Sequence, residues 1–427
     1  MPYGTTSKYF SSDMPGAPSI FADAGGLVGW LDAVLVNGYG AAVISQIVVT
    51  DGVAVVTTNL GHSLRKWMVA MNADTGHEGL NGEHRVIDAA GASYTFEVTG
   101  VPNGTYAGGS VKVAPLGFEI SYSATNRRIY RSKDTERRNA VSLFVDDTNT
   151  VSGWNIGSNK ALAQVKMVCD VVSIDNYVTL DTTWWHKSAV TSGTLARPWL
   201  LAGDALGFYS AVDVASNGFS IASNHFMQLN TLAAGDQFAT MLEGSNPSSD
   251  TVTSSPGLAS NGAAMNMLRT GTRRVARFLA QTGQAVNLRY MGLGVFATSN
   301  YSPYAVISSG GGYFTNESTG FNVVQAAGLS PVNAADSGLV LGKDVIACHS
   351  PSGLVGGTDF TARAIMPGLF SVPAICAWSM VPALIPVRDM VLLPLPAMTC
   401  ANANNPALTA GHVGGFYVDI AKGWRNE

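Results

Sequence analysis

The stretch that decides the fold is residues 61–113, GHSLRKWMVAMNADTGHEGLNGEHRVIDAAGASYTFEVTGVPNGTYAGGSVKV. Within it, Tyr94, Phe96 and Val98 alternate with polar residues, which is the pattern of a half-buried strand. We expect further extended segments over 62–71, 83–87 and 111–113, separated by the turn residues Asn81-Gly82 and Pro102-Asn103-Gly104. The stretch therefore predicts a complete small β-module, and it contains no pattern of reactive side chains.

One helix is expected immediately before this module. Leu27, Trp30, Leu31, Val34 and Leu35 form a single apolar stripe at helical spacing, and Asn37-Gly38 is a natural stop. We expect this helix to lie across a sheet. Segments 42–49 and 53–58 then predict a hairpin around Asp51-Gly52.

The whole chain predicts a mainly β, multi-domain protein of β-sandwich or β-barrel modules, with one N-terminal helix and long loops. Its 427 residues exceed what one core usually serves. We expect an extended arm over 1–18, which either reaches a neighbouring subunit or is a disordered tail, and a helix with an N-terminal β domain over 19–150. A second β-sandwich domain is expected over 151–260, and a Pro/Gly-rich β region packed on it over 261–427.

Composition indicates a protein that is covered by other proteins. Charged residues are only 13% of the chain and hydrophobic residues 46%, so few charges remain to coat a lone particle. An exported protein with a Ser/Thr/Asn/Gly surface is the alternative. The first 14 residues lack a signal peptide, and the apolar segment 378–398 contains Arg388, Asp389 and several prolines, so neither Sec export nor membrane insertion is expected.

Several short stretches resemble structural proteins of tailed bacteriophages. The resemblance rests on Gly61-His62, Trp67-Met68-Val69, Leu80-Asn81-Gly82-Glu83, Thr95-Phe96-Glu97-Val98, Gly104-Thr105 and Val111-Lys112-Val113, on 14–18, 31–33 and 36–38 near the start, and on 415–420 and 423–425 near the end. Segments 245–270 and 299–330 match nothing in that pattern. The resemblance implies a virion component, assembled in the host cytoplasm, whose partners are copies of itself and other virion proteins. A tail or baseplate position comes first, and a capsid decoration or head–tail connecting role is the alternative.

Two clusters of charged residues suggest phosphate binding or calcium binding as other functions. Residues 127–138 hold six basic side chains, but Asp134 and Glu136 lie among them, so a loop that is solvated or salt-bridged between subunits is favoured over a phosphate-binding patch. With a net charge of −4, nucleic acid is not an expected partner. Asp146 and Asp147 end a strand, where either an Asx-turn or a bound Ca²⁺ fits, and we favour the turn.

Residues 269–277 contain a second cluster of arginines, and the Thr and Gly residues on either side favour a strand there.

No catalytic, cofactor or metal site is predicted. Segment 338–343 has too few residues between its glycines for a phosphate-binding loop, and His77, Glu78 and His84 lack the spacing of a zinc-binding helix. The four cysteines form no close pair and indicate buried thiols: Cys169, Cys348, Cys376 and Cys400.

Two further functions stay open. A receptor-binding protein would contact a host cell-surface sugar through the loop 245–262, or through Trp184, Trp185 and Trp199, although burial of these tryptophans in the core is favoured. A β-rich glycan hydrolase needs two carboxylates that no motif identifies. We expect a non-enzymatic protein.

Overall fold

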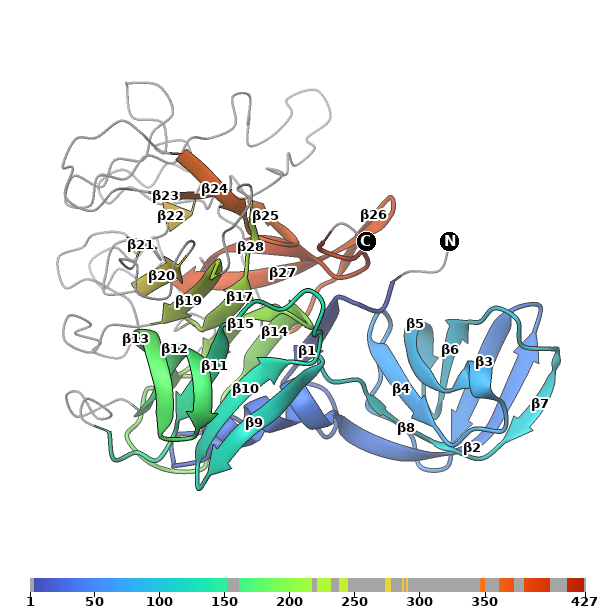
Figure 1. The fold of residues 1–427 in the computed structure, drawn as a ribbon. Coiled ribbons are helices and arrows are strands. Elements are labelled where there is room, and N and C mark those ends of the chain that lie inside the picture. Colours follow the sequence, from blue (N-terminus) through green and yellow to red (C-terminus); the bar gives the residue numbers. More distant parts are fainter. Residues whose placement is uncertain are drawn as a thin grey trace, which may run out of the picture.

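The computed structural model describes residues 4–151, 161–216, 221–231, 238–244, 273–277, 286–287, 289–290, 346–349, 361–371, 380–399 and 413–425. The described part is mainly β, as the sequence predicts, with barrel and sandwich sheets, an N-terminal helix and a short 3₁₀ helix (Figure 1). In this part no helix is long and apolar enough to cross a membrane.

The first body is a closed barrel of six strands in the order β2-β3-β6-β5-β4-β8, and it closes because β8 pairs with β2. Strand β7 pairs with β2 as an addition to the barrel. The strands are β2 (Tyr39–Thr50), β3 (Val53–Thr58), β4 (Val69–Ala73), β5 (Gly82–Ala90), β6 (Ser93–Glu97), β7 (Gly104–Ala107) and β8 (Ser110–Val113). A short 3₁₀ helix, Glu78–Leu80, precedes β5.

The barrel confirms most of the predicted module. The hairpin forms with Asp51 at φ 49° and Gly52 at φ 78° in its turn, and Tyr94 and Phe96 point into the core. The strand predicted over 62–71 is wrong in its first part, because β4 begins only at Val69. Trp67, at φ 70°, interrupts the extended chain just before it.

The predicted helix is present. It begins as α1 (Gly26–Leu31) and continues as a wider π-helix (Asp32–Asn37), and all five residues of the apolar stripe are buried. It ends at Gly38, whose φ of 70° suits glycine. The Tyr130 hydroxyl of β10 donates to Asp32 Oδ1 at 2.7 Å, which ties the helix to the sheet below it.

The second body is a sandwich of a five-stranded and an eight-stranded sheet. Phe118 and Trp185 of the first sheet meet Phe208 of the second edge-on, at ring-centroid distances of 6.4 and 5.8 Å. The first sheet has the order β13-β12-β11-β10-β9: β9 (Phe118–Ala124), β10 (Arg127–Ser132), β11 (Ser142–Asp146), β12 (Ala161–Ser173) and β13 (Asn176–Ser188). The second comprises β1 (Lys8–Ser11), β14 (Trp199–Asp204), β15 (Gly207–Asp213), β16 (Ile221–Ser223), β17 (His225–Gln228), β19 (Thr240–Gly244), β20 (Arg273–Arg277) and β21 (Val286–Asn287).

The sheets divide the chain differently from the predicted boundary at residue 150. Strands β11 and β12, which flank that boundary, are neighbours in one sheet, and β9 to β11 belong to the sandwich rather than to the N-terminal barrel. The change of body falls between Val113 and Phe118. Alternation within a strand does not show which distant strand it pairs with, so sequence reasoning misplaced this boundary.

The N-terminal segment is extended, but the arm predicted to reach a neighbour or to be disordered is wrong for residues 4–18. Strand β1 pairs with β14 of its own chain, and Lys8 bonds Glu83 of the barrel at 2.6 Å. The buried guanidinium of Arg85 donates to the carbonyls of Gly4 and Ser7. The segment therefore joins barrel and sandwich.

Two four-stranded sheets complete the described chain. One has the order β18-β24-β23-β22: β18 (Asn230–Thr231), β22 (Arg289–Tyr290), β23 (Ile346–His349) and β24 (Thr361–Ile365). The other has the order β25-β28-β27-β26: β25 (Leu369–Ser371), β26 (Ile385–Val387), β27 (Met390–Thr399) and β28 (Val413–Asp419). The buried Tyr209 of β15 donates to the Pro367 carbonyl, so this region packs on the sandwich, as expected.

Candidate functional site

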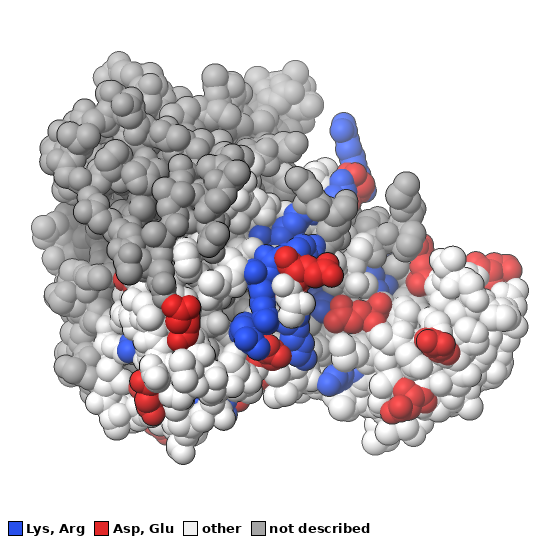
Figure 2. Space-filling view, in the orientation of Figure 1, with Lys and Arg blue, Asp and Glu red and all other residues white. Residues whose placement is uncertain are grey.

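The basic cluster of residues 127–138 is largely neutralised within the chain. The pairs are Arg127 with Asp146 and Asp175, Arg128 with Asp32, Arg131 and Arg138 with Glu119, and Arg137 with Asp134. The hydrogen bond from Arg131 holds the pKa of Glu119 below its usual range. Figure 2 shows the blue side chains gathered over the middle of the molecule with red ones among them. The expected salt bridges are therefore present, but they form within the chain and not between subunits, and residues 127–132 belong to strand β10 rather than to a loop. These paired arginines do not form a free phosphate-binding patch.

Asp146 makes the predicted Asx-turn. Its Oδ1 accepts hydrogen bonds from the backbone N–H and the hydroxyl of Thr148, at 3.1 and 2.6 Å. Its neighbour Asp147 points inward and pairs with Lys187, and both side chains are 0% exposed. In the described ranges no group of three or more His, Cys, Asp or Glu residues is arranged to hold a metal ion.

The three tryptophans considered for sugar stacking are core residues. Trp185 and Trp199 are 0% exposed and Trp184 is 7% exposed. The indole N–H of Trp185 donates to the Glu243 carbonyl at 2.6 Å, and that of Trp199 donates to the Pro18 carbonyl at 2.9 Å. The favoured burial is thus confirmed, and stacking on a sugar by these residues is contradicted. The loop 245–262 lies outside the described residues.

Other sequence candidates are resolved in part. Cys169 is buried, as predicted. Strand β20 confirms the strand interpretation for residues 273–277 of the second arginine cluster. Cys376, Cys400 and the segment 338–343 lie outside the described residues, and Cys348 lies on β23.

The sandwich contains a cluster of buried polar side chains that the sequence did not predict. His225 and Glu243, both 0% exposed, approach within 3.9 Å between Nε2 and Oε2. His225 Nδ1 accepts the Ser210 backbone N–H at 3.1 Å, which leaves the ring proton on Nε2, facing Glu243. The Ser210 hydroxyl donates to the Asn224 carbonyl rather than to His225, so these residues do not form a serine–histidine nucleophile pair.

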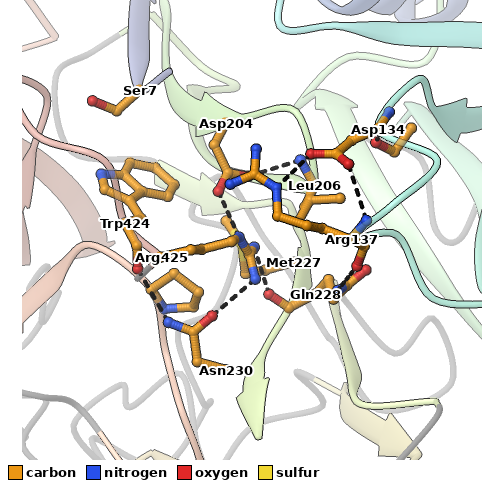
Figure 3. Close-up of polar contacts among 12 residues, drawn as sticks. Ser7, Asp134, Arg137, Asp204, Leu206, Met227, Gln228, Asn230, Trp424 and Arg425 are labelled. Carbon is orange, nitrogen blue, oxygen red and sulfur yellow. Dashed lines mark hydrogen bonds and ion pairs between the residues drawn. The ribbon is translucent and has the colours of Figure 1, made fainter. Parts of the chain in front are cut away.

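The C-terminal segment is fastened to the sandwich by one arginine, shown in Figure 3. Arg425 donates to Asp204 Oδ2 at 2.7 Å, the Gln228 carbonyl at 2.8 Å and Asn230 Oδ1 at 3.0 Å. The Arg425 and Asp204 side chains are only 10% and 8% exposed. Gln228 also bonds the Arg137 carbonyl, so the basic loop and the C-terminus are anchored on the same strand, β17.

The outer surface of the barrel carries a face of β-branched side chains, bordered by Glu97 and Asp88. One cross-strand row runs Thr105, Val48, Val55, Thr95 through β7, β2, β3 and β6. Val48 and Val55 are 37% and 42% exposed. We call this the threonine–valine face, which consists of Val48, Thr50, Val53, Val55, Thr57, Thr95 and Thr105. In Figure 2 the barrel side of the molecule is mostly white, with scattered acidic patches.

The sequence held a weak signal for this face. Val48, Thr50, Val53, Val55 and Thr57 lie on the predicted hairpin, but both faces of it are rich in β-branched residues. Only the closed barrel shows which set is inside, because Ile47, Val49, Ala54 and Val56 fill the core.

Neither a protein-family model nor a curated protein sequence matches this chain at a significant level.

Proposed function

We propose that this chain is a non-enzymatic structural subunit of a tailed bacteriophage particle, in the tail or baseplate, that assembles through protein–protein interfaces. The observation that carries the proposal is the threonine–valine face, whose central row of four uncharged side chains crosses β7, β2, β3 and β6 and includes two exposed valines. Two exposed acidic residues border it, because Glu97 is paired with Val53 and Asp88 with Thr95. A surface of this kind is a poor coat for a lone particle and a good contact for another subunit.

A second copy of this chain is the occupant that we assign to the face. The central row of four residues carries no charge, so it can meet the same row of a second copy without direct like-charge contact, and its Val and Thr side chains offer similar, interdigitating shapes. Contacts with other virion proteins complete the assembly, and its location is the virion. The capsid decoration or head–tail connecting role uses the same chemistry and remains the alternative position.

Sedimentation of the purified chain tests the assembly. We expect a concentration-dependent oligomer, and we expect Val48→Lys together with Val55→Lys to shift it towards monomer, because facing lysines repel and must be desolvated. The matched control is Val178→Lys on β13, where the valine is 39% exposed. A chain that stays monomeric at high concentration, or an oligomer that is equally sensitive to both changes, contradicts the assignment.

The position in a phage particle has its own test. Tail-tube and tape-measure genes beside the gene for this chain, and the chain itself in purified particles by mass spectrometry, are the expected results. A neighbouring hydrolase cassette without virion genes would contradict the proposal.

A further inference from the structure

The buried side chains of Lys187 and Asp147 meet the partly buried Asn149 where strands β11 and β13 of the first sandwich sheet end. Lys187 lies near the end of β13, and Asp147 and Asn149 follow β11. The Lys187 Nζ atom contacts Asp147 Oδ1, lies 2.9 Å from Asn149 Oδ1, and donates to the Asp23 carbonyl at 3.0 Å. All three directions of the amine are thus occupied by oxygen atoms, and one of them belongs to a side-chain amide.

The surroundings disfavour charge on either member of the ion pair. The Asp147 and Lys187 side chains are both 0% exposed. Burial raises the pKa of Asp147 and lowers the pKa of Lys187, while their mutual attraction opposes both shifts. A neutral amine beside a protonated carboxyl group is therefore more accessible here than at the surface, and a desolvated neutral lysine is a nucleophile.

The reacting atoms are held close together. Asn149 Oδ1 is one carbonyl bond from Cγ, so Nζ lies at most about 4 Å from that carbon. Asn149 has a left-handed backbone, φ 61°, and its Nδ2 donates to the Ala22 carbonyl at 3.3 Å. These contacts fix the amide against the amine, which is the kind of positioning that accelerates intramolecular reactions.

We propose that Lys187 and Asn149 form an intramolecular isopeptide bond, with Asp147 as the group that transfers the proton. The lone pair of neutral Lys187 Nζ attacks Asn149 Cγ and forms a C–N bond. Asp147 accepts a proton from Nζ and delivers one to Nδ2, the bond between Cγ and Nδ2 breaks, and ammonia leaves. The carbonyl oxygen is retained, nothing is oxidised or reduced, and Asp147 ends in its starting state.

Asp147 is the proton carrier rather than the electrophile. Its Oδ2 accepts the backbone N–H groups of Leu27 and Val28 at 2.7 and 3.3 Å, which fixes the carboxyl group and leaves Oδ1 towards the amine. Attack on Asp147 would release water instead of ammonia, so the two reactions differ in mass.

The bond would link β11 to β13 across the strand that lies between them. Lys187 and Asn149 are separated by 38 positions, and β12 lies between β11 and β13. The crosslink would close that loop covalently and restrict the unfolded chain in the manner of a disulfide, without depending on redox conditions. This inference is independent of the proposed function.

The intact mass of the purified, fully denatured chain decides the proposal. We expect a mass lower than the sequence mass by one ammonia, and a branched peptide that joins the Asn149 and Lys187 segments in tandem mass spectra of a digest. An intact mass equal to the sequence mass overturns the proposal. Loss of one water, or loss of ammonia without the branched peptide, as from a cyclised asparagine elsewhere, also overturns it.

Variants assign the roles. Asn149→Ala and Lys187→Met should have the mass of their sequences, and Asp147→Asn should slow or abolish ammonia loss although both reacting groups remain. Lys166→Met is the matched control, because Lys166 lies on β12 of the same sheet and its Nζ faces the Phe144 and Tyr177 rings. Ammonia loss that persists in Asn149→Ala would overturn the assignment, and the wild-type mass remains decisive if a variant does not fold.

Discussion

The anchoring of the C-terminus by Arg425 can be measured as a coupling energy. Replacement of Arg425 by Met keeps most of the apolar stem but removes the guanidinium. Three acceptors then lose their donor: Asp204 Oδ2, Asn230 Oδ1 and the Gln228 carbonyl. Removing one partner of a buried ion pair costs about 3–5 kcal/mol, and the remaining exposure of the Arg425 and Asp204 side chains, 10% and 8%, favours the lower end, about 3 kcal/mol.

Native-state hydrogen exchange is the suitable assay, because a chain of several bodies need not unfold in one step. The reporters are the amides of Asp419 and Ile420, which bond the Gly368 and Val391 carbonyls at 3.1 and 2.9 Å. A loss of about 3 kcal/mol speeds their exchange more than a hundredfold, since each 1.4 kcal/mol is about tenfold.

A double-mutant cycle with Asp204→Asn isolates the pair. Asn keeps the Oδ1 acceptor of the Leu206 N–H, 2.8 Å away, but lacks the charge that faces Arg425. We expect the double variant to lose about 2 kcal/mol less stability than the sum of the losses in the two single variants. Lys422→Met is the control, because Lys422 pairs with Asp389 at the surface, 48% and 70% exposed, and should leave exchange unchanged. Strictly additive costs would refute the reasoning.

Two other predictions concern the helix and the barrel. Gly29→Ala should stabilise the fold by about 0.5–1 kcal/mol, because Gly29 is exposed on α1 and no atom lies in the way of a Cβ. Gly38→Ala should destabilise the fold by about 2 kcal/mol or more, because the φ of Gly38 is 70° and its Cβ would strike the Val113 carbonyl. Thermal unfolding of both variants checks these opposite signs, and equal effects of the two changes would contradict the argument. Burial lowers the pKa of His84, whose ring stacks on Phe96 at a centroid distance of 4.0 Å. The unfolded chain therefore binds a proton at His84 more tightly than the folded chain does. The free energy of unfolding should decrease as pH falls from about 6.5 towards the pKa of His84 in the folded state. His84→Gln should flatten that slope in urea unfolding series at several pH values, and an unchanged slope would contradict it.

Local features of this fold were readable in the sequence because short-range chemistry determines them. The turn at Asp51-Gly52 needs positive φ, which these residues tolerate, and the stop at Gly38 follows from the same property. The alternation around Tyr94 and Phe96 identified buried side chains without knowledge of their partners.

Long-range pairing was not readable. The barrel closes where Tyr39 meets Val113, and β1 finds β14 nearly two hundred positions away, with Lys8 opposite Gly203. Nothing in a strand's own alternation specifies such partners, because many strands of this chain offer the same pattern. The boundary predicted at residue 150 failed for this reason.

The candidate sites show the same division. The Asx-turn at Asp146 is local and was predicted, whereas the Asp147 contact with Lys187 spans 40 positions and was not. Burial of Trp185 and Trp199 was predicted from the residue type, whereas their hydrogen-bond partners, the Glu243 and Pro18 carbonyls, lie far away in the sequence and were not.

The distribution of charge links the fold to the proposed assembly. Charged residues are only 13% of the chain, and several of them form ion pairs that connect distant segments: Lys8 with Glu83, Asp32 with Arg128, and Asp204 with Arg425. Charges fixed in such ion pairs are not available to coat the surface, and the central row of the threonine–valine face, Thr105, Val48, Val55 and Thr95, has none. Since a row of uncharged side chains with exposed valines favours association over solvation, the internal use of charge and the proposed contact between copies follow from the same composition.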